Sequence, residues 1–315
     1  MSAIALSSRA VTGMYFEALA ANPGAAWVNA VSNYFQSDQT VESYKWLGMP
    51  PALREWLGGR NAKGFTTNGI DIANKHFEST IEIALRDLRL DKSGQVRARI
   101  GELAERGGTH FASLLSTLMV NGASTVCYDG QYFFDTDHSE GSSGTQSNKI
   151  DVDISALPAA VHGSVTAPSP EEMQQAMLAG ITQMYGFKDD VGEPLNENAA
   201  SFMVVVPVGL SQAALSALSM VRAAGTSTFA VENFNIALAM NPRLTSAGWT
   251  DKFAIFRADG SIKPLIRQEE TAPTLKVKDE NSEYAFDNDA IQVGIDTWRN
   301  VGYGRWQGAV QVTLT

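Results

Sequence analysis

The stretch that decides the fold runs from Tyr44 to Ile83 and reads YKWLGMPPALREWLGGRNAKGFTTNGIDIANKHFESTIEI. Trp46 and Trp56 offer large apolar surfaces, whereas residues 60–69 (RNAKGFTTNG) are polar, rich in turn-forming residues and have little to pack. A segment of this composition cannot bury itself alone. The sequence therefore predicts a long extension that is anchored by aromatic residues at its base and lies on a neighbouring copy of the chain.

The composition describes a chain that can bury a sizeable core. The 315 residues are 44% hydrophobic, which excludes disorder throughout. The 34 acidic residues outnumber the 24 basic ones, and the formal net charge is −10. A protein that grips nucleic acid over its whole surface needs clustered Lys and Arg, so this class is disfavoured. The acidic balance fits a container wall along which DNA slides, and it fits an ordinary bacterial protein equally well.

The single cysteine, Cys127, excludes an intramolecular disulfide and suits a reducing cytoplasm. Its neighbours Val126 and Tyr128 predict a buried strand thiol rather than a nucleophile. The N-terminal residues lack the basic stretch and long apolar run of a signal peptide. The most apolar run, residues 202–210, is too short to cross a bilayer, so no membrane association is expected.

Hydrophobic periodicity predicts both helices and strands, and hence an α+β fold. A long helix is expected over residues 94–121, where Gly107–Gly108 should bend or break it. The pattern Ser169-Pro-Glu-Glu172 predicts a helix that begins with a capping box. Further expectations are a short helix over 27–35, a helix to about 220 and strands at 70–83, 202–206, 236–240, 252–257, 262–267, 290–301 and 306–314.

Two turns are also expected in the C-terminal half. Asp259-Gly260 is a strong hairpin signal between the strands at 252–257 and 262–267. Residues 268–274 are expected to form a turn. The stretch FFDTDH, residues 133–138, is expected to be a strand followed by a loop.

Asp135, Asp137 and His138 form the cluster whose residue types best suit a metal ion, with Asp129 nearby. A turn closed by aspartate side chains on backbone N–H groups explains the same residues without an ion. The glycine pairs match no phosphate-binding loop, and no nucleophile elbow occurs. We therefore expect no enzyme site and no cofactor.

Three sequence motifs, in this order along the chain, resemble the major head (capsid) proteins of Mu-type tailed bacteriophages. The first motif combines REW-x-G-x-R with N-K-x-F-E-x-T-I, the second is CYDGQYFFDTDH at residues 127–138, and the third is GYGRWQGAVQVTL at residues 302–314. The matching residues of the first motif are Arg54, Glu55, Trp56, Gly59, Arg60, Asn74, Lys75, Phe77, Glu78, Thr80 and Ile81.

The resemblance implies the Hong Kong 97-type phage capsid fold, in which an arm and a long loop embrace neighbouring subunits. The implied segments are an N-terminal arm at 1–41, an E-loop at 42–91, a P-domain spine helix at 92–124, an A-domain at 125–269 and returning P-domain strands at 270–315. Tryptophan and arginine dominate interface hot spots, so an assembly interface on the E-loop is predicted. Its residues are Trp46, Arg54, Glu55, Trp56, Arg60, Phe77 and Glu78.

The resemblance further implies a major capsid protein of a Mu-like prophage, the repeating subunit that forms pentamers and hexamers of an icosahedral head around double-stranded DNA. Such a subunit is assembled in the bacterial host cytoplasm and ends in the virion. The sequence opens with the arm and has no long charged helical leader, so a separate scaffolding protein is expected, together with a portal protein. The resemblance also leaves room for a decoration protein. DNA would lie close to the shell without specific binding.

Two other functions stay open at this point. An encapsulin-like nanocompartment shell protein shares the implied fold but encloses an enzyme. A metal-dependent hydrolase would use Asp135, Asp137 and His138.

Overall fold

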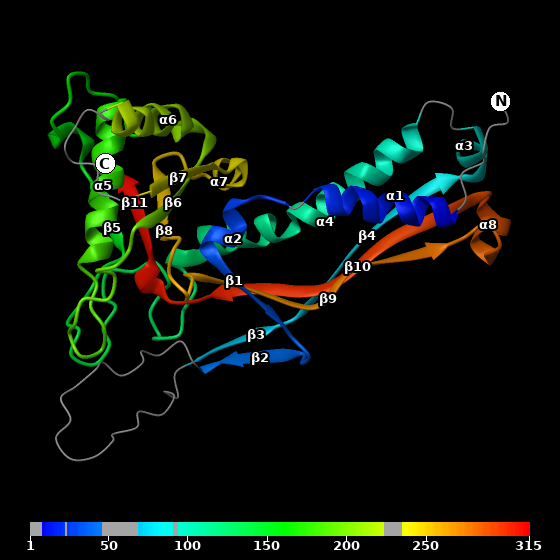
Figure 1. The fold of residues 1–315 in the computed structure, drawn as a ribbon, viewed down its shortest axis with the longest axis horizontal. Coiled ribbons are helices and arrows are strands. Elements are labelled where there is room, and N and C mark those ends of the chain that lie inside the picture. Colours follow the sequence, from blue (N-terminus) through cyan, green and yellow to red (C-terminus); the bar gives the residue numbers. More distant parts are fainter. Residues whose placement is uncertain (1–7, 23, 46–68, 91–93, 224–234) are drawn as a thin grey trace, which may run out of the picture.

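The computed structural model describes residues 8–22, 24–45, 69–90, 94–223 and 235–315. The molecule is elongated, with a compact lobe at one end and a long arm at the other, and a two-stranded ribbon leaves the body between them (Figure 1). No helix within these ranges is long and apolar enough to cross a membrane.

A four-stranded sheet, in the order β1-β9-β10-β4, forms the floor of the arm. β9 and β10 pair in antiparallel fashion, and each contains 14 residues, which corresponds to about 46 Å of extended chain. The elements of the arm are α1 (Ser8–Ala21), α2 (Trp27–Val31), β1 (Ser32–Gln36), β4 (Lys75–Ala84), α3 (Leu85–Leu90), α4 (Gln95–Val120), β9 (Leu265–Lys278), α8 (Glu283–Asn288) and β10 (Ala290–Tyr303).

A five-stranded mixed sheet, in the order β5-β11-β8-β6-β7, forms the compact lobe. Helix α5 packs on β8 and β11, where a Cβ at Gly180 would come within 2.6 Å of Ile255, so only glycine permits this approach. The elements of the lobe are β5 (Lys149–Val152), α5 (Pro170–Tyr185), β6 (Ser201–Val206), α6 (Val208–Ala223), β7 (Asn235–Met240), α7 (Pro242–Ser246), β8 (Lys252–Arg257) and β11 (Ala309–Leu314).

Helix α4 belongs to both hydrophobic cores of the molecule. Its first half contributes Ile100 and Leu103 to the core of the arm, together with β4, β10 and α1. Its second half contributes Leu115 and Met119 to the larger core, which extends into the compact lobe. With 26 residues, α4 is about 39 Å long and mechanically joins the two parts. The residues between the two apolar segments are mostly polar.

The helix predicted at 94–121 is confirmed, and of the expected bend or break at Gly107–Gly108 the break does not occur, because α4 is continuous from Gln95 to Val120. The pair instead allows close packing of the N-terminal segment. A Cβ at Gly108 would come within 2.8 Å of the Asn22 carbonyl oxygen, and a Cβ at Gly107 within 3.3 Å of the Tyr15 hydroxyl. The capping box at Ser169 and Glu172 is present as predicted.

Several local predictions for strands and turns are wrong. The predicted hairpin at Asp259–Gly260 does not form, because β8 and β9 belong to different sheets. Residues 268–274 are part of β9 rather than a turn. The strand predicted at 70–83 divides at Asn74 into β3 (Ile70–Ala73) and β4, which also lie in different sheets.

Two further predictions fail in part. The helix expected over 27–35 ends at Val31, and the chain continues as β1, which pairs in parallel with β9. The stretch at 133–138 is not a strand; Phe133 and Phe134 are buried in irregular chain, where their rings pack edge to face. Burial of these aromatic side chains gives the same apolar pattern that a strand would.

Candidate assembly surface

The ribbon that leaves the body consists of β2 (Val41–Tyr44) and β3. The two strands are antiparallel, with Val41 opposite Ala73 and Tyr44 opposite Ile70 (Figure 1). The base of the predicted extension therefore lies within the described residues. Its remainder, residues 46–68, lies outside the described residues, and with it five predicted interface residues: Trp46, Arg54, Glu55, Trp56 and Arg60.

A buried glutamine on β9, Gln268, holds the base of the ribbon. Its side chain is fully buried and accepts a hydrogen bond from the Tyr44 hydroxyl at 2.8 Å. Its amide nitrogen donates to the Asn74 side-chain oxygen at 2.8 Å and to the Ile72 carbonyl at 3.1 Å. One side chain of the arm sheet thus contacts both strands of the ribbon and the residue at which the ribbon ends.

Asn74 extends this network to the turn that precedes β2. Its amide nitrogen donates to the Ser37 hydroxyl at 3.0 Å and to the Gln39 carbonyl at 2.8 Å. Both Asn74 and Ser37 are buried, so each of these polar groups requires a partner. The network fixes the angle at which the ribbon leaves the sheet. Asn74 belongs to the first sequence motif, whereas no pattern in the sequence indicated a role for Gln268.

The other two predicted interface residues, Phe77 and Glu78, lie on β4. Phe77 is half-buried within the chain, and its ring packs edge-on against that of His110 with 4.5 Å between centroids. Glu78 is exposed and accepts a hydrogen bond from the Thr80 hydroxyl at 2.9 Å. Glu78 is the more exposed of the two, and the role of both residues in assembly stays a prediction.

Charged and aromatic side chains pack together where β1, β9 and β10 meet. Arg299 is 3% exposed, and its guanidinium lies 4.7 Å from the centroid of the Phe111 ring and 3.7 Å from the Glu269 carboxylate. The Tyr34 hydroxyl donates to the same carboxylate at 2.6 Å. Burial, followed by the interaction with Glu269, raises the pKa of Tyr34 to about 12, so this phenol stays a hydrogen-bond donor at neutral pH.

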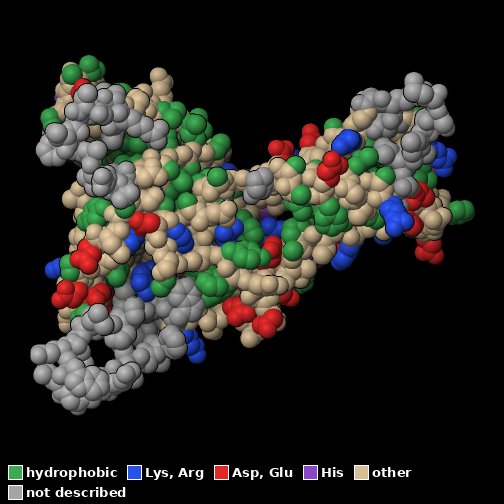
Figure 2. Space-filling view, viewed as in Figure 1, with side chains coloured by type: hydrophobic (Ala, Val, Ile, Leu, Met, Phe, Trp, Pro, Cys, Tyr) green, Lys and Arg blue, Asp and Glu red, His purple; other side chains and the backbone are tan. Residues whose placement is uncertain are grey.

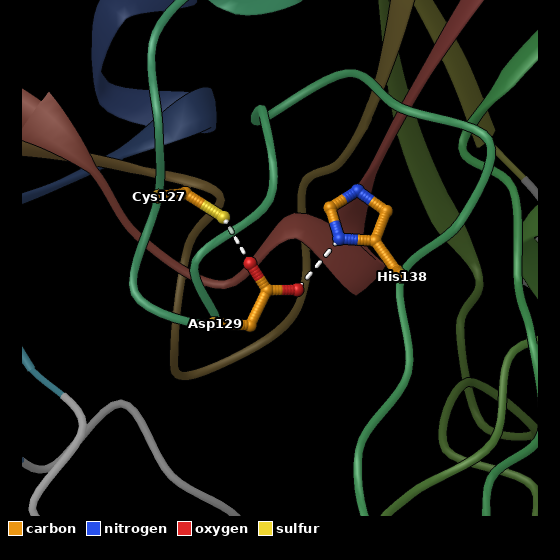
Figure 3. A group of neighbouring side chains, drawn as sticks. All are labelled: Cys127, Asp129 and His138. Atoms are coloured by element: carbon orange, nitrogen blue, oxygen red, sulfur yellow. Dashed lines mark hydrogen bonds and ion pairs between the residues drawn. The ribbon is translucent and has the colours of Figure 1, made fainter.

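Three residues of the second sequence motif, Cys127, Asp129 and His138, form a hydrogen-bonded cluster (Figure 3). The Asp129 carboxylate accepts from the Cys127 thiol at 3.0 Å and lies 2.6 Å from Nδ1 of His138. His138 is fully buried, and its ring stacks on that of Trp306 at 4.0 Å and 11°. The cluster thereby fastens the irregular chain around residues 127–138 to the segment that joins β10 to β11.

The cluster considered as a possible metal site, Asp135, Asp137 and His138, does not come together, because His138 points to Asp129 instead (Figure 3). The Asp135 carboxylate accepts hydrogen bonds from the backbone N–H groups of Thr136 and Tyr132, which is the aspartate-closed turn that was the alternative. Among the described residues, the side chains that could share an ion are Cys127, Asp129 and His138, whose ligand atoms lie within 4.8 Å of one another.

The chemistry of Cys127 disfavours both nucleophilic attack and metal binding. Burial raises the pKa of the thiol far above its ordinary value, and the Asp129 carboxylate adds to the rise. A thiolate is the form that attacks or binds a metal, so the group as found is a neutral donor to Asp129. The prediction that Cys127 is buried is confirmed, although it does not lie in a strand.

The fold is similar to that of solved capsid and virus-like-particle proteins. The procapsid of bacteriophage JBD30 matches with a TM-score of 0.56 and 23% identity over 96% of this chain and 72% of that one. The capsid of cyanophage P-SCSP1u gives 0.55 at 10% identity, over 93% and 89%. A virus-like particle from Pyrococcus furiosus gives 0.53 at 11% identity, over 96% and 98%. At these identities the likeness establishes the fold, which is the predicted Hong Kong 97-type capsid fold.

The family follows from the sequence. The profile of the family described as Mu-like prophage major head subunit gpT matches residues 6–158 and 241–315. The chain belongs to this family, which confirms the resemblance inferred from the three sequence motifs.

Two relatives are named as head proteins. The Mu-like prophage FluMu major head subunit of Haemophilus influenzae is 27% identical over 282 residues, which are 89% of this chain and 63% of that protein. The major capsid protein of Escherichia phage Mu is 33% identical over 138 residues, 41% of this chain and 45% of that one. The chain thus spans less than two thirds of the length of either relative.

Proposed function

We propose that the protein is a major capsid protein, the repeating subunit of the icosahedral head of a Mu-like phage or prophage. Family membership and the shared fold support this function. The observation that carries it is the β2–β3 ribbon, which the Gln268 network holds away from the body. A ribbon directed outward by buried hydrogen bonds is suited to placing the segment between its strands on a neighbouring subunit.

The segments carry the roles that the fold implies. The segment at 1–41 would be the N-terminal arm of the capsid fold, which is distinct from the long arm of the molecule described above. The E-loop at 42–91 would lie across a neighbour, and α4 would be the spine helix of the P-domain at 92–124. The A-domain at 125–269 would gather at the centres of pentamers and hexamers. The returning strands at 270–315 contribute to both sheets of the molecule, because β10 lies in the four-stranded sheet of the long arm and β11 in the five-stranded sheet of the compact lobe.

Assembly would rest on many weak contacts. Each subunit contributes an extension and receives others, so small free energies per contact sum through multivalency. We propose pentamers and hexamers as the assembly units, with a scaffolding protein, a portal protein and a decoration protein as partners. Assembly would take place in the host cytoplasm and the product would be the virion. The net charge of −10 suits a wall that lies next to DNA without binding it tightly.

The test is the assembly state of the purified chain. Light scattering and negative-stain electron microscopy should show pentamers, hexamers or closed shells, with or without a co-expressed scaffold. A monomer at every concentration under both conditions contradicts the proposal. A gel-shift titration near physiological salt should show no sequence-specific complex with duplex DNA.

A pair of variants tests the extension itself. Trp56→Ala removes an aromatic side chain whose truncation costs about 3–5 kcal/mol where it is buried. Thr66→Ala removes one hydroxyl at the expected tip of the extension, within the polar segment at residues 60–69. Shell yield should fall much further for Trp56→Ala, and equal yields would refute the role of Trp56 as the anchor.

A further inference from the structure

A hollow lies beside α4 in the stretch between its two apolar segments. The cavity has a volume of about 280 Å³, and its walls come from β4 and β10 of the arm, from α4 itself and from α7 of the compact lobe. Figure 2 shows the surface hollowed near the middle of the molecule, with basic side chains beside the opening. One water needs roughly 10–15 Å³ of such space, so the cavity admits a polyatomic ligand together with water.

The charges that line this cavity are predominantly positive. Arg106, Arg243 and Arg299 contribute three guanidinium groups, against the single carboxylate of Glu78. Within the described part of the chain, neither Arg106 nor Arg243 forms an ion pair. Arg299 lies 3.7 Å from the Glu269 carboxylate and donates from Nε to the Thr297 hydroxyl at 2.8 Å. In a chain with a net charge of −10, three arginines around one cavity form a site of opposite sign to the whole.

A histidine in the same wall has an unused polar atom. Nδ1 of His110 is buried and has no hydrogen-bond partner among the described residues. Buried polar atoms are almost always paired, so this nitrogen, next to a cavity, is available to pair with a ligand. His110 lies four residues after Arg106, which places the two side chains on the same face of α4. In the tautomer with its proton on Nδ1, the ring is a neutral donor to an anion.

We propose that this cavity binds a tetrahedral oxyanion, either phosphate or sulfate. The planar guanidinium donates paired hydrogen bonds that match oxyanion geometry, and such charge-assisted bonds are the strongest available to a protein. Arg106 and His110 reach the ion from α4, Arg299 from β10 and Arg243 from α7. The bound ion therefore bridges the arm and the compact lobe and offsets the repulsion among the three arginines.

The site does not depend on the proposed role in a shell, and its test uses the full chain with its assembly state recorded. Phosphate is titrated calorimetrically into the protein in chloride buffer at constant ionic strength, and the ¹³C-labelled imidazole signals are followed by NMR. We expect one saturable isotherm, a shift of the His110 signal and competition by sulfate. Acetate at the same ionic strength should have little effect, because it lacks the third and fourth oxygens.

The matched variants separate the site from a general ionic effect. Arg106→Gln with Arg243→Gln removes two exposed guanidiniums without breaking an ion pair found in the described chain. Circular dichroism checks that the fold is retained, and phosphate affinity should fall at least tenfold. Arg89→Gln, an exposed arginine on α3 outside the cavity, should bind as the unmodified chain does. No saturable binding, equal binding by the double variant, or an equal response to acetate would each overturn the proposal.

Discussion

Replacement of Gln268 by leucine tests the view that buried hydrogen bonds direct the ribbon. Leucine has a similar volume and fits a fully buried position, so the change removes polar contacts without opening a large cavity. Three groups lose their partner on Gln268: the Tyr44 hydroxyl, the Asn74 side-chain oxygen and the Ile72 carbonyl. Each lies at the base of the ribbon.

The expected cost follows from these three groups. A buried donor or acceptor that loses its partner costs about 1–3 kcal/mol, and the apolar leucine recovers part of the loss. We therefore expect the base of the ribbon to lose roughly 3 kcal/mol of stability, which corresponds to about a hundredfold increase in local opening. Tyr44 and Ile72 belong to the larger core, but most of that core and all of the arm core lie outside the ribbon. Global unfolding should therefore change less than the opening of β2 and β3.

Hydrogen exchange resolved to the amides of β2 and β3 measures this opening, and shell yield measures its consequence. Gln39→Leu is the matched control, because Gln39 lies in the adjoining turn, is exposed and uses only its backbone in the network. The control should exchange and assemble as the unmodified chain does. If both variants exchange alike, the network does not hold the ribbon, and the reasoning fails.

Three further predictions concern the body of the protein. Gly180→Val should lower the melting temperature by overpacking α5 against Ile255 and Val312, at a cost of about 1–3 kcal/mol or more. Gly101→Val, with open space around its Cβ position, should cost little, because valine forms helices at least as well as glycine. Iodoacetamide should leave Cys127 unmodified in the folded protein and alkylate it in urea, because burial raises the pKa of the thiol; rapid labelling of the folded chain would contradict this. Burial, with the charges of Arg299 and Arg243, lowers the pKa of His110 to about 4. The unfolded chain, with a histidine pKa of about 6.5, therefore binds more protons between pH 4 and 6.5, and this contribution to stability is full above that window and lost as the pH falls through it. Urea unfolding at pH 7 and pH 4.5 should show a smaller acid-induced loss in His110→Gln, and equal losses would refute the assignment.

The sequence predicted best those elements whose causes are local. The helix α5 begins at Ser169 because two side chains within one turn satisfy its first backbone N–H groups, and the motif is contained in four consecutive residues. Helix α4 was equally clear, since the apolar positions of both its halves keep helical spacing. Asn74 lies in the first sequence motif, but nothing in the sequence indicated its hydrogen-bond partners.

Elements whose causes lie far away in the sequence were missed. Residues 268–274 contain Pro273 and suggest a turn, but they belong to β9. β1 pairs with β9 only as far as Glu269, so Pro273 lies where one edge of the strand is open. The pairing with β10 also skips Pro273 at an irregularity. A proline costs no ladder hydrogen bond in such a place, and only the register of three strands reveals this.

The Asp259–Gly260 signal failed for a related physical reason. A hairpin turn requires that the two flanking strands pair with each other, yet β8 pairs with β6 and β11. The Asp259 carboxylate instead accepts hydrogen bonds from the backbone N–H groups of Ala200 and Ser201 and pairs with Arg257 at 2.7 Å. The residue type that favours a turn therefore caps the start of β6, because an aspartate satisfies distant N–H groups as well as local ones.

The base of the ribbon explains why a polar network suits this position better than an apolar one. Apolar burial is proportional to area and has no preferred direction, so a ribbon held by it alone could leave the sheet at several angles. The bonds of Gln268 and Asn74 are satisfied together at one angle, and a half-satisfied buried network is heavily penalised. Gln268→Leu should therefore affect the direction of the ribbon more than the global stability of the chain. Its chains should fold and yet form fewer regular shells, a result that loss of stability alone would not produce.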